Sequence, residues 1–468
     1  MYLFIIISIN TNKLSISYYF CTKCKTIAIL SLNKNIYTTF LTQFPILIFN
    51  FAASVYVTRV LGVEGKGVFS IFAANIQLLA LILGVSLNAG IIYFISSKKL
   101  KVQKILGLSV YILAFSTVIG LIIVFVSSGL DNILLAENYE SLFFKLYLHF
   151  SFVLTIVNTI FIGVFQAYKM YGVINRITII NSFINGLVFI LMYYGYMMKV
   201  FESEIQNVFL YTLIILLVNF TMWFFVYVKK IKLFPSLKLS YKNDISPFFE
   251  YIGIGHLSNI INFFNYRLDI WFISYFNNME QLGLYSLAVS LSQMLLMITN
   301  PISVVLFPYL SEISDRYRKL KLMSFFSRLN VVALLTTSII AYFIGGWFIP
   351  ILYGADFVKS VGVFHLMVIA VFFMGITKIL TAYIASENLV KYNLYGTIIG
   401  FSVTLLLNIA LIPLYGIYGA AITSILTYLS ILLYAVYKIY IINKGFHINL
   451  FFISLSDIIL IKNRKIIE

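Results

Sequence analysis

Residues 64–70 read Glu-Gly-Lys-Gly-Val-Phe-Ser, and residues 280–286 read Glu-Gln-Leu-Gly-Leu-Tyr-Ser. Each copy leads into an apolar run that holds Gln and Leu at matching positions, Gln77 and Leu79 in the first and Gln293 and Leu295 in the second. A weaker echo pairs Ala167 and Asn175 with Ala385 and Asn393 at a nearly equal offset. The chain is therefore expected to contain two similar halves, and an internal repeat of this kind is common in transporters.

The composition around this repeat is that of a membrane protein. Of the 468 residues, 61% are apolar and only 10% are charged, against roughly 25% charged in an ordinary soluble domain. A soluble protein of this size needs a charged surface, whereas a surface that faces lipid does not. The net charge of +17 sits in short clusters between apolar runs, which is typical of cytoplasmic loops and does not favour a nucleic-acid partner.

Apolar runs long enough to cross a bilayer, about 20 residues each, predict twelve spans. We expect them near residues 38–58, 68–95, 105–127, 146–167, 177–198, 208–228, 248–275, 283–309, 325–349, 360–382, 393–413 and 416–440. The stretch 449–461 is shorter and contains Asp457, so it is expected to lie on the membrane surface. The predicted fold is all-α, with two six-helix lobes related by a parallel repeat.

Basic residues alternate between the two sides of this arrangement and predict its orientation. One side carries Lys98, Lys99, Lys101, Lys104, Lys169, Arg176, Lys229, Lys230, Lys232, Lys238, Lys242, Arg316, Arg318, Lys319, Lys321, Arg328, Lys391, Lys438, Lys444, Lys462, Arg464 and Lys465. The other side carries only Arg59, Lys66, Lys145, Lys199 and Lys359. The positive-inside rule then places both termini in the cytoplasm.

The expected organisation has four parts. Residues 1–32 form an atypical N-terminal extension, 33–235 the N-lobe, 236–446 the C-lobe and 447–468 a cytoplasmic tail. Cys21 and Cys24 lack the further ligands of a zinc site. The sequence also lacks a phosphate-binding glycine loop with a lysine, so it predicts no nucleotide site. We expect neither a metal nor a cofactor.

Several segments resemble a known family. They are Thr58–Ser70, Tyr266-Arg-Leu-Asp269, Gly283–Ala288, Leu352–Phe357 and Asn408–Ala421. Their order and spacing resemble polysaccharide flippases of the Wzx/RfbX type, which belong to the multidrug/oligosaccharidyl-lipid/polysaccharide exporter superfamily with its MATE-like fold. The resemblance covers roughly residues 33–465.

This resemblance implies an activity and its surroundings. Such proteins move undecaprenyl-pyrophosphate-linked oligosaccharide repeat units across the bacterial inner membrane by alternating access, during O-antigen or capsule biosynthesis. It also implies an inward gradient of protons or sodium ions, the lipid bilayer as surroundings, and polysaccharide assembly proteins as partners.

Charged residues inside the spans are the main site candidates, because a charge at the centre of a span costs at least about 2.5–3.5 kcal/mol. Arg267 is predicted to hold the pyrophosphate. Residues two apart on a helix point about 200° from each other, so a simple pair with Asp269 is not expected. Asp269 is a candidate for ion coupling, with a salt bridge to another helix as the alternative. Lys378 is a candidate for substrate binding or for snorkelling to the interface.

Other candidates rest on weaker patterns. Arg59, at an outer helix end, is a candidate for gating or substrate contact, or for an interfacial position. His256 lies in a span and is a candidate for proton coupling, although a single histidine in a helix is more often a structural residue. Polar residues on one face of the first and eighth spans, including Asn50 and Gln293, either join helices or line a wet cavity.

Two other functions compete with a flippase. A drug or lipid-precursor exporter of the same fold is favoured less. Exporters of cationic drugs favour acidic cavities, whereas the charges inside the spans are mainly basic, with Arg267 and Lys378 against Asp269. A polysaccharide polymerase or glycosyltransferase is expected to carry a long polar outer loop, and the sequence has none. The prediction is therefore a transporter rather than an enzyme.

Overall fold

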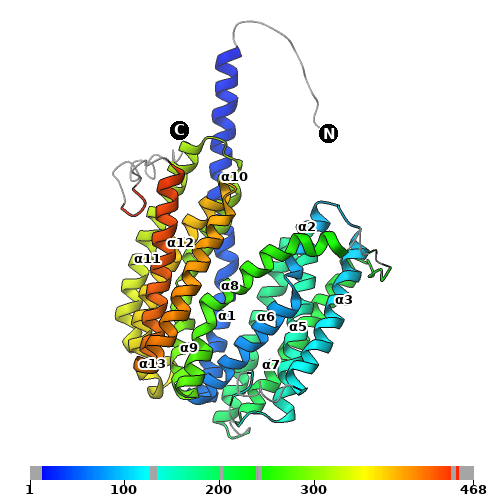
Figure 1. Cartoon of the computed structure of the whole chain (residues 1–468), viewed down its shortest axis with the longest axis vertical. Coiled ribbons are helices and arrows are strands. Elements are labelled where there is room, and N and C mark those ends of the chain that lie inside the picture. The colour runs from blue at the N-terminus through cyan, green and yellow to red at the C-terminus, as the bar shows by residue number, and fades with distance from the viewer. Residues whose placement is uncertain are drawn as a thin grey trace.

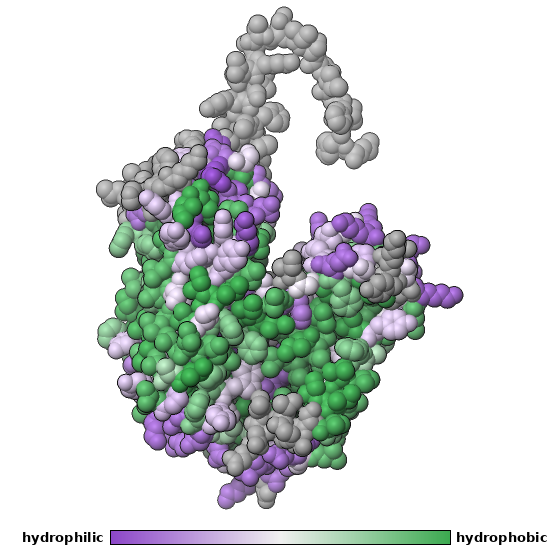
Figure 2. All heavy atoms as spheres, viewed as in Figure 1, coloured by the Kyte–Doolittle hydropathy of each residue, from purple (hydrophilic) through white to green (hydrophobic). Residues whose placement is uncertain are grey.

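The computed structural model describes residues 13–126, 134–136, 138–200, 204–238, 240, 245–443 and 449–452, with side chains from residue 43 onward except that of Ile254. These parts of the chain are helical, with no strand among them. The helices stand roughly side by side in two bundles that meet at one end and separate toward the other (Figure 1). Figure 2 shows a broad apolar band between two polar ends, as a membrane-spanning protein requires.

The helices follow the predicted spans closely. In chain order they are α1 (Lys13–Gly84), α2 (Leu87–Ser96), α3 (Val102–Leu121) with η1 (Ile122–Val126), α5 (Leu142–Ala167), α6 (Tyr171–Met197), α7 (Ile205–Lys230), α8 (Ser246–Phe276), α9 (Met279–Gln293), α10 (Leu296–Glu312), α11 (Arg316–Tyr353), η4 (Ala355–Lys359), α12 (Ser360–Ser386) and α13 (Val390–Ile442).

Two of these helices each contain two spans joined by a glycine. Gly62 breaks α1 with a φ of 67°, and Gly416 breaks α13 with a φ of 56°. This left-handed conformation is strained for a residue with a Cβ, so glycine is the residue that permits such a tight join. Helices α1 and α13 thus supply two spans each, and α9 and α10 together form one bent span. With α3, α5, α6, α7, α8, α11 and α12, the described helices make the twelve expected spans.

The second and eighth spans are bent at positions that the sequence did not predict. Val85 and Ser86 adopt left-handed φ angles of 45° and 50° and separate α2 from α1. The axes of α9 and α10 differ by 50°. The ninth span is also longer than predicted, because α11 already begins at Arg316, where the Asp315 side chain accepts hydrogen bonds from the first backbone N–H groups.

The two bundles form the N-lobe and the C-lobe. The N-lobe contains both halves of α1 together with α2, α3, α5, α6 and α7, and the C-lobe contains α9 to α13 (Figure 1). The first half of α1 packs on α6, where the ring centroids of Phe49 and Phe183 are 5.2 Å apart. Helix α8 connects them, because Tyr251 near its start stacks on Tyr93 of α2, with ring centroids 3.8 Å apart, while its second half packs on α13. The expected surface position of residues 449–461 falls largely outside the described residues.

The lobes separate toward the side that carries the basic loops. The connections α2–α3, α10–α11 and α12–α13 all lie at the open end (Figure 1). Gly416 lies next to Asn277 and Gln281 at the α8–α9 connection. Val63, directly after Gly62, lies against Gly283 of α9, so both glycine breaks are at the closed end. The space-filling view shows the resulting notch between the two bodies (Figure 2). The protein is therefore open toward the basic side and closed on the opposite side.

Candidate functional site: a cationic cavity between two lobes

The closed end is formed by a close contact between α1 and α9. A Cβ atom added at Gly67 would lie 1.9 Å from the carbonyl oxygen of Met279, and one added at Gly283 would lie 1.9 Å from that of Val63. Next to this contact, the hydroxyl of Ser70 donates to that of Ser286 over 2.8 Å. The two glycines therefore permit two helix backbones to touch, which a side chain at either position would prevent.

A cavity of about 200 Å³ lies beside this contact, and we call it the vertex cavity. Its lining comes from both lobes: Lys66, Phe69, Ser70, Ala73, Ala74 and Gln77 of α1, Tyr266, Arg267, Asp269 and Ile270 of α8, and Tyr285, Ser286, Val289 and Ser290 of α9. Arg267 therefore faces a cavity at the lobe interface, which is the placement that an in-span charge requires.

The vertex cavity carries more positive than negative charge. Lys66 is buried, at 8% exposed, and is near enough to Arg267 for the two charges to repel. Neither cation forms an ion pair or a side-chain hydrogen bond with the residues that the structure describes. Two unneutralised cations around one small cavity favour an anion between them.

Asp269 is the acidic residue of this cavity, and its contacts are polar rather than ionic. Its carboxylate accepts hydrogen bonds from the Tyr285 hydroxyl and from the backbone N–H of Ile270. No ion pair with Arg267 is seen, in line with the divergence expected for residues two apart on a helix. Asp269 remains a candidate for ion coupling.

A second cavity, which we call the portal cavity, brings the two predicted polar stripes together. It measures about 650 Å³ and lies between the first half of α1 and the α9–α10 bend, with Asn50 on one wall and Gln293 and Asn300 on the other. Asn50 also accepts a long hydrogen bond of 3.5 Å from Asn185 of α6. Both polar stripes thus face the gap between the lobes.

An apolar groove of about 470 Å³ continues from the portal cavity. The two cavities share Leu47 and Met294, and the groove extends between α1 and α11 along Phe51, Ile340, Ile344 and Phe348. Its lining is almost entirely hydrocarbon, so a lipid tail is a suitable occupant. A polar space and an apolar groove are therefore adjacent at the lobe interface.

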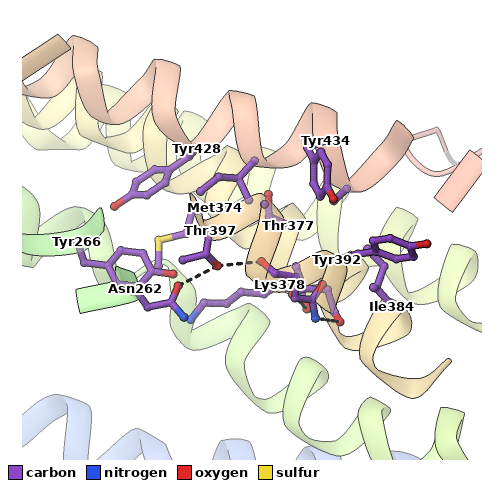
Figure 3. Close-up of a pocket in the computed structure, with 15 residues that line it drawn as sticks. Asn262, Tyr266, Met374, Thr377, Lys378, Ile384, Tyr392, Thr397, Tyr428 and Tyr434 are labelled. Carbon is purple, nitrogen blue, oxygen red and sulfur yellow. Dashed lines mark hydrogen bonds between the residues drawn. The ribbon is translucent and has the colours of Figure 1, made fainter. Parts of the chain in front are cut away.

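Lys378 links the portal cavity to a third cavity inside the C-lobe. Its ammonium donates a 2.7 Å hydrogen bond to Asn300 of the portal cavity, and its side chain lines a C-lobe pocket of about 370 Å³ (Figure 3). We call the latter the C-lobe pocket. The roles considered for Lys378, substrate binding and snorkelling to the interface, stay predictions.

Arg59 and His256 lie elsewhere. Arg59 donates to the carbonyl oxygens of Ile351 and Leu352 at the end of α11, 2.6 Å each, so it joins α1 to the C-lobe at the closed side. His256 Nδ1 lies 3.1 Å from the hydroxyl of Ser86 at the break between α1 and α2. Neither is part of the cavity linings described above, and their roles stay predictions.

Lys66 is the main cavity residue that the sequence interpretation missed. The charge pattern predicts Lys66 in a loop on the less basic side. The break at Gly62 instead starts the next span at once, which places Lys66 inside the membrane protein core. A charged residue between Gly65 and Gly67, within the repeated motif, was the available signal.

Solved structures with this architecture are transporters and a lipid flippase. An inward-facing multidrug resistance MATE family transporter of the MOP superfamily is 12% identical and superposes with a TM-score of 0.65 over 86% of this chain and 96% of its own. Lipid II flippase MurJ in an inward closed conformation is 14% identical, with a TM-score of 0.61 over 84% and 87%. The Vibrio cholerae MATE transporter VcmN in its bent form is 15% identical, with a TM-score of 0.58 over 89% and 99%.

At these identities the likeness shows the fold, which is the MATE-like architecture that the family resemblance implies. No curated protein matches the sequence. A family model described as "Polysaccharide biosynthesis protein" matches residues 32–314, more than half of the chain. The protein is therefore a multi-pass membrane protein of the polysaccharide biosynthesis protein family, with the fold that MATE transporters and the lipid II flippase MurJ share.

Proposed function

We propose that the protein flips an undecaprenyl-pyrophosphate-linked oligosaccharide across the bacterial inner membrane by alternating access. The observation that carries this proposal is the vertex cavity, where Arg267 and the buried Lys66 face one small space without ion-pair partners among the described residues. A pyrophosphate supplies several anionic oxygens, and a guanidinium binds such oxygens in bidentate geometry.

The surrounding cavities suit the other parts of such a substrate. The portal cavity offers amide and hydroxyl groups to a glycan, and the adjoining apolar groove offers hydrocarbon to a polyprenyl tail. All three spaces lie at the lobe interface, with the vertex cavity beside the closed end. With both termini in the cytoplasm, as the basic loops favour, the open side faces the cytoplasm, where such a substrate is made.

Asp269 and His256 are the proposed ion-coupling residues. Asp269 shares the vertex cavity with Arg267, so a proton or sodium ion bound there would compete directly with the attraction between the two side chains. In proteoliposomes with an imposed proton or sodium gradient, we expect Asp269→Asn to lose the dependence of transport on the gradient. An unchanged gradient dependence would assign the coupling to other residues.

The proposal is tested by transport of a defined lipid-linked oligosaccharide. The purified protein is reconstituted in vesicles with fluorescent undecaprenyl-pyrophosphate glycan, and the glycan exposed on the far leaflet is measured with an impermeant lectin. Wild-type protein is expected to expose the glycan, and Arg267→Ala is expected not to. A cationic dye offered in the same vesicles tests the drug-exporter alternative, which transport of the dye but not of the glycan would support.

A further inference from the structure

The C-lobe pocket is separate from the vertex cavity, although the two share Tyr266. It lies between α8, α12 and both halves of α13 (Figure 3). Its volume of about 370 Å³ falls within the roughly 300–1,000 Å³ of small-molecule sites. Since the proposed pyrophosphate position is at Arg267, the residue next to Tyr266, a group in this pocket would be close to the pyrophosphate along the substrate.

The lining of this pocket combines aromatic rings with neutral polar groups. Four tyrosines, three threonines and two asparagines take part: Tyr266, Tyr392, Tyr428, Tyr434, Thr377, Thr381, Thr397, Asn262 and Asn393. The rings of Tyr266 and Tyr428 have centroids 6.0 Å apart. A sugar ring has an apolar C–H face and a rim of hydroxyls, so aromatic faces beside amides and hydroxyls suit it better than they suit a hydrocarbon.

Two buried polar atoms in this lining have no partner. Asn393 Oδ1 and Tyr434 Oη make no hydrogen bond to the described part of the protein. The Asn393 amide is held in place, since its Nδ2 donates to the Thr381 carbonyl over 3.0 Å. A buried unpaired polar atom costs free energy unless something binds it. A sugar hydroxyl can donate to Asn393 Oδ1, and another can accept from Tyr434.

Lys378 adds a charge preference. Among the described residues that line the pocket it alone carries a formal charge, and it forms a hydrogen bond to Asn300 but no ion pair with an acid in that part of the chain. An ammonium with only one neutral acceptor has capacity for an anionic one. The lining thus favours a negatively charged substituent over a cationic one.

We propose that the C-lobe pocket is a glycan subsite that binds one sugar residue with a carboxylate, such as a hexuronic acid, close to the pyrophosphate. This inference rests on the proposed flippase function and names the substrate class that its site selects. Tyr266 and Tyr428 pack against the ring, Asn393 and Tyr434 bond its hydroxyls, and Lys378 binds the carboxylate.

The test uses the full-length protein in lipid nanodiscs and three soluble probes. Methyl β-glucuronide and methyl β-glucoside are compared by saturation-transfer NMR, and inorganic pyrophosphate is titrated separately by calorimetry. We expect the glucuronide to bind about tenfold more tightly than the glucoside, the effect of one charge-assisted hydrogen bond. Lys378→Met is expected to abolish this preference, and Tyr434→Phe to weaken both glycosides.

Controls and contrary outcomes separate this inference from the proposed function. Lys230→Met removes an exposed cation at the end of α7, away from the pocket lining, and should change nothing. If pyrophosphate binds in an Arg267-dependent manner but neither glycoside does, the subsite is wrong and the proposed function stands. If no probe binds, both are wrong. Equal binding of the two glycosides would overturn the charge preference. Should Lys378→Met fail to fold, Tyr434→Phe, which removes one oxygen, still tests the pocket.

Discussion

The closed end of the molecule is symmetric, whereas the cavity beside it is not. At the closed end the repeat offset of 216 residues relates the partners to each other: Ser70 bonds Ser286, Gly67 touches Met279, and Gly283 touches Val63. Each residue on one lobe contacts the counterpart of its own neighbour, as in a two-fold interface between identical subunits. The repeated motif therefore forms the contact that closes the protein.

The charges of the cavity have no such counterparts. At the same offset, Phe51 corresponds to Arg267, Ala53 to Asp269 and Leu282 to Lys66. Phe51 stacks on Phe348, with ring centroids 5.8 Å apart, in the apolar groove. The two-fold symmetric positions therefore close the lobes, whereas the asymmetric positions face the substrate that we propose.

The largest expected effect comes from the symmetric contact. Gly67→Ala or Gly283→Ala places a Cβ against a backbone carbonyl that cannot move aside, and such overpacking costs up to about 3 kcal/mol, or about 100-fold in the population of this state. Both variants should therefore lose most glycan transport in vesicles, and to the same extent.

The control for this prediction is Gly253→Ala, since a Cβ there meets nothing within 4 Å. A cysteine at Ser290, in a background with Cys21 and Cys24 replaced by serine, reports which side reaches the vertex cavity. We expect labelling from the side opposite the basic loops to rise in both glycine variants. Normal transport by either variant, or a loss in only one of the two, would contradict an equal contribution of Gly67 and Gly283 to the closed end.

The next effect in size concerns Arg267. Arg267→Ala should lower transport by roughly 10- to 100-fold at an unchanged protein level, because a hydrogen bond to a charged group contributes about 1.5–3 kcal/mol. Arg267→Lys should keep part of the activity, since the charge remains and the bidentate geometry is lost. Arg176→Ala, at an exposed position on α6, is the matched control.

Moving the charge to the repeat-related position tests whether the cation must lie in the vertex cavity. In the double variant Phe51→Arg with Arg267→Ala, the charge moves to the repeat-related position, which lies in the apolar groove and not in the vertex cavity. We expect no recovery of transport. Recovery would show that the two lobes are interchangeable as substrate sites.

A smaller effect is expected for Lys66. Lys66→Met keeps much of the packing of this buried side chain and removes one of two cations, so binding of inorganic pyrophosphate should fall by about tenfold. Thermal stability should stay equal or rise, because the repulsion between Lys66 and Arg267 is removed. A loss of stability with unchanged pyrophosphate binding would make Lys66 a structural residue.

The smallest effect is expected for Arg59. Arg59→Ala loses the hydrogen bonds to the carbonyls of Ile351 and Leu352, but the side chain is exposed, and exposed charge contacts contribute only up to about 1 kcal/mol. Transport should change by no more than about fivefold, while pyrophosphate binding stays as in the wild type. A loss of pyrophosphate binding would move Arg59 from closure to substrate contact.

Much of this architecture was predictable because the membrane restricts what a chain can do. Apolar runs must be helices, since lipid offers no partner to backbone N–H and C=O groups. The repeated motif predicted two lobes, and Arg267 inside a span predicted a cavity there. The bends at Val85–Ser86 and between α9 and α10 were not predicted, because an apolar run has the same composition whether it is straight or bent.

The sequence alone determined the spans, the two related halves, the basic side and the family, because each depends on local composition or on order along the chain. The tertiary structure alone decided which side chains share a space. Lys66 meets Arg267 across two lobes, Lys378 reaches the C-lobe pocket, and Arg59 turns to the end of α11. These outcomes depend on how helices rotate and cross, and the packing of residues far apart along the chain sets that geometry.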